Sequence, residues 1–230
     1  MRASWFYDGK LVVVEMGVEK FGEKIMKGIE EARKEIKRRI DWALTTLQSI
    51  FKFPEPGEKF PLITGKPSFF ERIRGKGKFY DQLSYVILKV LRDECPKRGG
   101  IITLSDIVLL INRGREDDPL TLDTILTALK NLEEKNVIPK IKTLPSGAKV
   151  VSFSPVELSN DHWAVLDLAS SKGWVTLEEI ILKTGWSTEK AQMVLEDLER
   201  TGIAVRDVKY DRGLRWYFPS FASKTKLRGE

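Results

Sequence analysis

The sequence predicts a mainly α-helical protein with small β-ribbons, in which a long N-terminal helix is followed by two tandem winged-helix domains. Three observations predict this fold: a long helical stripe of apolar residues near the N-terminus, an internal repeat in the remainder, and the same order of helices and strands in both copies. The 230 residues are enough for two or three small domains.

The first 16 residues are predicted to form an extended hairpin segment. Residues 5–14 contain two β-prone runs joined by Asp8-Gly9, a dipeptide typical of tight hairpin turns.

Residues 17–78 are predicted to form a long helix and a connecting segment. Apolar residues recur at steps of three and four from Val18 to Phe51, and Lys, Arg and Glu occupy the other face. Such a helix would be roughly 50 Å long, so we expect part of its stripe to meet a second helix or a partner chain. The following Pro-, Gly- and Lys-rich stretch indicates a loop with one short helical turn near Phe69-Phe70.

The rest of the chain repeats itself. IITLSDI (101–107) returns as WVTLEEI (174–180), and ALKNLEEKNVI (128–138) returns as VLEDLERTGIA (194–204). We expect the domains to span residues 79–155 and 156–221, followed by a basic tail, 222–230.

Each copy follows one order of elements. A leading helix (79–94, then 161–171) runs into a short extended piece and a helix that Thr103 or Thr176 should N-cap. A further helix (121–135, then 188–201) precedes two strands. The turns between these strands are Pro145-Ser146-Gly147 and Asp211-Arg212-Gly213. Three helices followed by a β-ribbon make the winged-helix form of helix-turn-helix.

Composition argues against an enzyme, a metal site or a cofactor site. The chain has one His and one Cys, whereas a zinc site or a nucleophilic triad draws on several such residues. It contains no phosphate-binding or dinucleotide-binding glycine motif and no Gly-x-Ser-x-Gly elbow. We therefore expect no catalytic residues, no metal and no cofactor. The lack of a signal-peptide pattern and of a long apolar run predicts a cytoplasmic protein.

The alternative function is that of a winged-helix transcriptional regulator that binds DNA. The net charge of +6 permits it, but the excess is confined to residues 1–80, with 17 basic and 11 acidic residues. Both candidate recognition helices are acidic: the second carries Glu189, Glu196, Asp197 and Glu199 against Lys190 and Arg200. Such a helix would be repelled by a phosphate backbone, so the sequence favours protein docking over nucleic acid.

Aromatic residues of the second copy are the candidate partner-binding residues. Six large aromatics lie within about 60 residues, more than a small ribbon domain readily buries. We expect most to be core and Trp186 and Trp216 to be the exposed exceptions. The full set of predicted partner-binding residues is Trp163, Trp186, Trp216 and Tyr217.

An ordered set of motifs resembles one known family. The segments are 61–66 (PLITGK), 79–83 (FYDQL), 99–104 (GGIITL), 155–162 (PVELSNDH), 165–169 (VLDLA), 173–176 (GWVT) and 216–221 (WYFPSF). Together they resemble the ESCRT-II subunits of the vacuolar protein sorting twenty-two (EAP-thirty or Snf-eight) family, closely over residues 60–221. The resemblance implies that Asp161 and His162 mark the start of the second domain. Asp161 should N-cap the first helix of that domain, so we expect the neighbouring His162 to have a structural role.

The resemblance implies a non-catalytic scaffold that is peripheral on endosomal membranes. Its partners would be a larger related ESCRT-II subunit and a small winged-helix subunit, and the complex would sort membrane proteins into multivesicular bodies and pass assembly on to ESCRT-III. The chain departs from the family in its hairpin-like start, because members usually begin with a basic, membrane-binding helix. Basic residues of the long helix could supply membrane attraction instead, although a solvated face partly balanced by glutamates fits slightly better. These candidates are Lys20, Lys24, Lys27, Lys34, Lys37 and Arg38.

Overall fold

Helices and small antiparallel sheets alternate along the chain in the computed structural model, which describes residues 4–7, 10–13, 15–50, 67–209 and 213–221. The helices are α1 (Glu15–Ile50), α2 (Phe69–Arg74), α3 (Lys78–Glu94), α4 (Leu104–Ile111), α5 (Leu122–Glu134), α6 (Asn160–Ala169), α7 (Leu177–Thr184) and α8 (Thr188–Arg200), with 3-10 turns η1 (Pro96–Arg98) and η2 (Pro219–Phe221). The strands are β1 (Ser4–Tyr7), β2 (Lys10–Val13), β3 (Ile101–Thr103), β4 (Lys142–Thr143), β5 (Lys149–Ser152), β6 (Trp174–Val175), β7 (Val205–Lys209) and β8 (Gly213–Tyr217).

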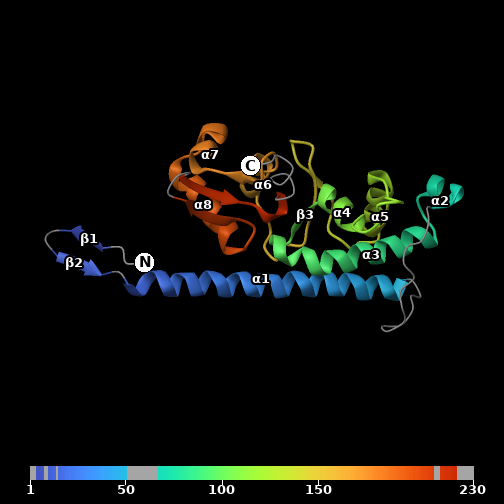
Figure 1. The fold of residues 1–230 in the computed structure, drawn as a ribbon, viewed down its shortest axis with the longest axis horizontal. Helices are drawn as coiled ribbons and strands as arrows, with labels where there is room; N and C mark the ends of the chain where they lie inside the picture. Colours follow the sequence, from blue (N-terminus) through green and yellow to red (C-terminus); the bar gives the residue numbers. More distant parts are fainter. Residues whose placement is uncertain (1–3, 8–9, 14, 51–66, 210–212, 222–230) are drawn as a thin grey trace.

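Helix α1 runs along one side of an elongated molecule, with the two repeats seated on it (Figure 1). The first repeat, α3 to β5, lies over its C-terminal half, and the second, α6 to β8, lies toward its N-terminal half. The predicted N-terminal hairpin is confirmed: β1 and β2 pair antiparallel, with Ser4 opposite Val13 and Tyr7 opposite Lys10. The predicted turn residues, Asp8 and Gly9, lie outside the described residues.

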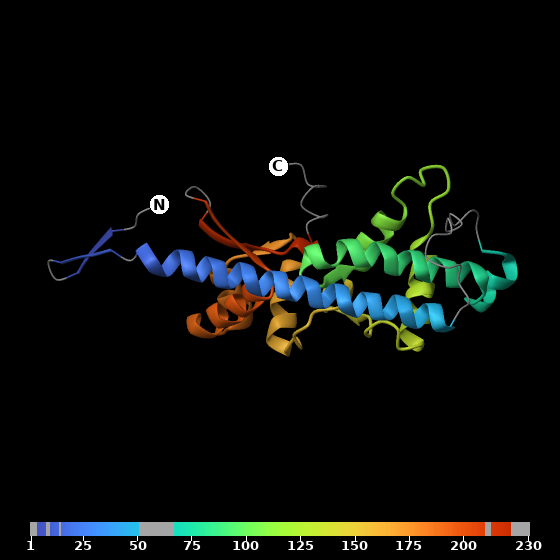
Figure 2. The same cartoon turned by 90° about the horizontal axis from the view of Figure 1, so that it is seen from below.

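The prediction of a long helix with an apolar stripe is confirmed. Helix α1 has 36 residues, and Ile36, Ile40, Ala43 and Leu47 are fully buried along one face. Figure 2 shows α3 lying beside α1, and these residues share one core with α3. A second helix of the same chain therefore covers this part of the stripe, as the length of the helix led us to expect.

The helix starts predicted within each repeat are also confirmed. The Thr103 hydroxyl accepts a hydrogen bond from the Asp106 N–H and caps α4, and the Thr176 hydroxyl accepts one from the Glu179 N–H and caps α7. Capping satisfies an N–H that would otherwise lack a helical partner. The segment near Phe70 forms α2, the expected short helix, which Ser68 caps through a capping box with Glu71.

Each repeat ends in a three-stranded antiparallel sheet. The strand orders are β3-β5-β4 and β6-β8-β7, so the short extended piece of each repeat pairs with the last strand of its ribbon. In the first repeat, the Gly147 N–H donates to the Leu144 carbonyl at the tip of the ribbon. At the corresponding tip of the second repeat, residues 211 and 212 lie outside the described residues.

The sheet of the first repeat is shared between two hydrophobic cores. Ile102 and Val151, which lie opposite each other, belong to the core that includes α1, α3, α4 and α5. Their neighbours Ile101 and Val150 belong to the core of the second repeat. Because successive side chains of a strand point to opposite faces, one three-residue strand contributes to both cores.

Close backbone contacts also join the repeats. A Cβ on Gly99 would lie 2.5 Å from the Gly202 carbonyl oxygen, and φ at Gly99 is +67°, so this contact requires glycine. The Ser220 hydroxyl donates to the Arg98 carbonyl at 2.9 Å. The Arg39 guanidinium of α1 donates to the Ser154 carbonyl at 2.7 Å, in the connection between the repeats. Among the described residues, no helix combines the length and apolar character needed to cross a bilayer.

Candidate protein-docking surface

The four tryptophans of the second repeat differ in burial. Trp163 on α6, Trp174 on β6 and Trp186 in the turn after α7 are half-buried. Trp216 on β8 is 2% exposed and belongs to the core. The first three therefore leave part of their rings at the molecular surface, and the fourth does not.

The expectation that Trp216 is exposed is wrong. In the centre of the sheet, Trp216 pairs with Val175 on one side and Arg206 on the other, and its ring points inward, as does Phe218 two residues on. Tyr217 lies between them in sequence, so its side chain points to the other face and stays half-buried. The Trp216 Nε1–H is buried and has no hydrogen-bond partner among the described residues. Residues 216–218 are all aromatic, so they show no alternation of apolar and polar residues that could have indicated which face Trp216 occupies.

A basic side chain lies over the ring of each half-buried tryptophan. The Nζ atoms of Lys142 and Lys190 lie 4.3 and 4.5 Å from the ring centroids of Trp163 and Trp186. Trp174 carries Lys172 at 3.7 Å. The negative face of an aromatic ring attracts an ammonium group, and the charged end of the lysine stays hydrated at the surface. These tryptophans thus sit under flexible, charged side chains, typical of a polar-rimmed aromatic surface.

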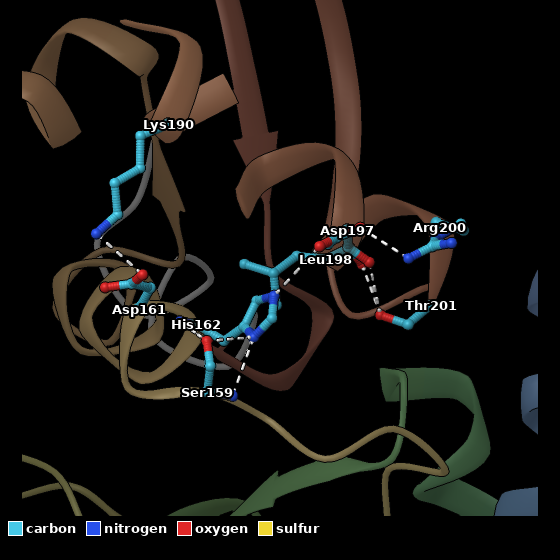
Figure 3. Close-up of polar contacts among 8 residues, drawn as sticks. All are labelled: Ser159, Asp161, His162, Lys190, Asp197, Leu198, Arg200 and Thr201. Carbon is cyan, nitrogen blue, oxygen red and sulfur yellow. Dashed lines mark hydrogen bonds and ion pairs between the residues drawn. The ribbon is translucent and has the colours of Figure 1, made fainter. Parts of the chain in front are cut away.

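Figure 3 shows how the start of α6 is fastened to α8. Ser159 is the N-cap: its hydroxyl accepts from the His162 N–H, and the His162 Nδ1 accepts from the Ser159 N–H at 3.1 Å. The expectation that Asp161 caps this helix is therefore wrong. Asp161 lies inside the first turn and forms an ion pair of 3.0 Å with Lys190 of α8.

His162 has a structural position, as predicted. Since Nδ1 accepts a backbone N–H, the neutral ring carries its proton on Nε2, which lies 3.9 Å from the Asp197 carboxylate (Figure 3). The ring bridges the cap of α6 and the middle of α8. Ser159 and Asp161 take part in the same contact between α6 and α8, and Lys190, which pairs with Asp161, also lies over the ring of Trp186.

The exposed face of α8 is acidic and suits a protein better than DNA. Glu189, Gln192, Met193 and Glu196 are exposed on it. Its basic residues already form ion pairs: Lys190 with Asp161 of α6, and Arg200 with Asp197 of α8 itself. The pKa of Glu189 is lowered, chiefly because its backbone N–H bonds to the carboxylate and also through Ser187, so this carboxylate stays charged. Negative charge on this face disfavours a phosphate backbone.

The predicted membrane-binding residues all lie on α1. Lys27, Lys34, Lys37 and Arg38 are exposed, and Arg38 is paired with Glu35 at 2.9 Å. Lys20 and Lys24 belong to the same helix, but their side chains are not among those described.

Sequence reasoning missed a cavity beside Trp42. This side chain is 60% exposed on α1, at a cavity of about 460 Å³. The cavity is lined by Glu35, Arg38, Arg39, Trp42, Val137, Pro139 and Phe153. Trp42 lies off the apolar stripe, one turn after Arg38 and Arg39, and this position outside the stripe is the signal that could have revealed the cavity.

Among the described residues, no three His, Cys, Asp or Glu side chains come together in a group that could hold a metal ion. Cys95 is fully buried, and its burial raises the pKa of the thiol, which keeps it protonated and poorly reactive.

The model of the EAP30/Vps36 family matches residues 20–208, which include α3 to α8 and most of α1. The chain belongs to the EAP30/Vps36 family. Its relatives in this family include the vacuolar-sorting protein SNF8 of Xenopus tropicalis, 34% identical over 166 residues. That alignment covers 70% of this chain and 62% of the relative. The chain thus matches less than two thirds of the length of this relative.

Two further comparisons agree with this assignment. The vacuolar protein sorting-associated protein 22 homolog 1 of Arabidopsis thaliana is 30% identical over 174 residues, covering 71% of this chain and 66% of the relative. The fold is similar to a chain in a crystal structure of the endosomal complex ESCRT-II (VPS22/VPS25/VPS36), with a TM-score of 0.57 at 16% identity. This likeness covers 93% of this chain and 98% of the other.

Proposed function

We propose that this chain is a non-catalytic scaffold subunit of an ESCRT-II-like complex. In this role it docks a larger sister subunit and a small winged-helix subunit. The complex works in the cytoplasm, peripherally on endosomal-type membranes, where it sorts membrane proteins into multivesicular bodies and links to ESCRT-III. The observation that carries the proposal is family membership over residues 20–208, which takes in the first repeat and the second repeat as far as β7. The solved ESCRT-II complex, whose fold the chain resembles, holds three kinds of subunit.

The two repeats are, in this proposal, winged-helix domains spanning residues 79–155 and 156–221. Support comes from the order of elements, three helices and a three-stranded antiparallel sheet in each copy. The hairpin (1–16), the long helix with its connection (17–78) and the basic tail (222–230) complete the proposed organisation.

The second repeat provides the docking surface for the small subunit. Trp163, Trp186 and Tyr217 contribute half-buried aromatic surface, and aromatic residues dominate the energetics of many interfaces. Trp216 supports this surface from within the core and does not itself contact the partner.

Co-expression tests the proposal. The chain is produced with the sister and small ESCRT-II subunits of its own organism, and the mixture is separated by size exclusion with light scattering. One stable complex containing all three chains is expected. Separate elution of the three chains would overturn the proposal, and a gel shift of duplex DNA at low salt would favour the transcriptional alternative.

A matched pair of variants tests the docking residues. Trp186→Ala should weaken binding of the small subunit about tenfold or more while leaving the melting temperature nearly unchanged, because the ring is half-buried. Trp216→Ala should lower the melting temperature instead, because it empties the core. Equal thermal losses in both variants, with unchanged affinity for Trp186→Ala, would remove Trp186 from the interface.

A membrane contact through α1 is the second part of the proposal. The exposed Lys27, Lys34 and Lys37 support it, since each basic residue near an anionic surface adds about 1 kcal/mol.

A further inference from the structure

A second concavity lies on the opposite flank of α1 from the Trp42 cavity. It occupies the region where the middle of α1 meets the C-terminal end of α3 and η1, which lie side by side in Figure 2. Its volume is about 660 Å³. The lining residues are Arg33, Lys34, Lys37, Arg92, Asp93, Glu94, Pro96 and Lys97.

Positive charge dominates this groove. Its lining holds five basic and two acidic side chains. Arg92 is paired with Asp41, and Lys97 is paired with Glu94 at 2.7 Å.

Three of the basic side chains have no acidic partner in the part of the chain that the structure describes. Arg33, Lys34 and Lys37 are exposed, and no ion pair joins them to any carboxylate described. Glu30 lies one turn before Arg33 and forms no such pair either. Arg33 and Lys37 are four residues apart on one helix, where like charges repel each other and destabilise the helix. An anionic ligand would relieve this repulsion.

We propose that this groove binds a compact phosphate-bearing group, with Arg33, Lys34 and Lys37 as its main contacts and Lys97 at its edge. Phosphate oxygens accept several charge-assisted hydrogen bonds at once, and Arg and Lys are the side chains that recognise them. A multiply phosphorylated inositol ring, free in solution or as a lipid headgroup, carries the negative charge that would balance these three basic side chains.

The lining of the groove favours such a ligand over an acidic protein segment. Peptide-binding sites are anchored by apolar or aromatic pockets, and Pro96 is the only apolar side chain that lines this groove within the described residues. The groove is also concave, which suits a headgroup inserted between helices better than general attraction to a flat surface. The lipid form of the proposal rests on the proposed membrane contact of α1, whereas binding of the soluble form does not.

Two double variants separate the groove from the rest of the basic face. K34Q/K37Q removes two charges from the groove. K27Q/R38Q removes the same charge from exposed positions of α1 that do not line it. Full-length wild type and both variants are titrated with a soluble inositol trisphosphate by calorimetry. They are also tested for sedimentation with phosphatidylcholine vesicles that contain either phosphatidylserine or a phosphoinositide at matched total charge.

The proposal predicts saturable binding of the soluble inositol phosphate that falls about tenfold or more in K34Q/K37Q and less than about twofold in K27Q/R38Q. Preference for phosphoinositide vesicles, lost in K34Q/K37Q alone, would identify the lipid as the source; soluble binding without vesicle binding would identify a free phosphate compound. If both variants lost binding equally and neither kind of vesicle were preferred, the groove would not be the binding site. The proposed membrane contact of α1 would remain compatible with that result. Absence of binding to the soluble probe and to both vesicles would overturn both.

Discussion

The two repeats share a sequence pattern, but they differ in how deeply the same position is buried. Asp106 and Glu179 each follow a capping threonine by three residues, and each pairs with a basic residue seven or eight positions earlier. The Asp106 side chain is 2% exposed beside Arg98, whereas the Glu179 side chain is 27% exposed beside Lys172. The first pair is enclosed and the second is open to solvent.

The difference follows from the neighbours of each repeat. The Arg98 side chain also reaches the Pro219 carbonyl, and the Ser220 hydroxyl bonds to the Arg98 backbone, so the end of the second repeat closes over η1. Lys172 instead lies over the half-buried ring of Trp174. The repeated motif therefore specifies the same local structure in both repeats. The neighbouring elements decide whether its ion pair is buried at a contact between repeats or exposed at the surface.

The largest expected effect tests the shared sheet. Ile101→Ala and Ile102→Ala should each lower the free energy of unfolding by about 3 kcal/mol, since both side chains are fully buried. Hydrogen exchange should distinguish them: Ile101→Ala loosens amides of α6–α8, and Ile102→Ala those of α3–α5. If both variants loosened only the first repeat, the sheet would not be shared.

The paired ions provide the next test. Arg98→Ala removes the ion pair to the buried Asp106 carboxylate and should cost about 3 kcal/mol. Lys172→Ala, at the half-exposed pair, should cost about 1 kcal/mol, including its contact with Trp174. Denaturant melts measure both values; equal losses would show that the two positions are equally buried in solution.

A smaller effect is expected at the start of α6. Ser159→Ala removes the cap and should cost about 1 kcal/mol, whereas Asp161→Ala removes only a half-exposed ion pair and should cost about 0.5 kcal/mol or less. A larger loss in Asp161→Ala than in Ser159→Ala, measured by thermal melting, would restore Asp161 as the cap.

The smallest effect concerns pH and the joint between α2 and α3. The pKa of Glu71 is lowered, first because the Phe79 N–H bonds to its carboxylate and then because Ser68 does. A lowered folded-state pKa stabilises the fold above the unfolded value of 4.5, and this stabilisation is lost as pH falls through the lowered pKa. The Phe79 amide resonance should therefore shift with pH below 4.5 in the wild type and not in Glu71→Gln.

Sequence periodicity was sufficient for the elements that depend on local interactions. The helical stripe was expected from Val18 to Phe51, and the described helix spans 15–50. Both threonine caps lie where the repeat placed them. Family resemblance, carried by runs such as 155–162, was confirmed by the family match.

Tertiary packing accounts for what the sequence did not reveal. The exposure of Trp216 was predicted wrongly because counting aromatics does not show which face of a strand they occupy. The division of Ile101 and Ile102 between two cores depends on how two repeats meet, and no local pattern contains that information. The cap at Ser159 was missed because several capping residues precede α6 and only geometry selects among them.

Hydrogen-exchange footprinting of the assembled complex tests the central claim most directly. The chain is compared alone and with the small winged-helix subunit added. New protection is expected in peptides around Trp163 and Trp186, with little change across α3–α5. Protection confined to the first repeat or to α1, with the peptides around these tryptophans unchanged, would contradict the claim that the second repeat is the docking surface.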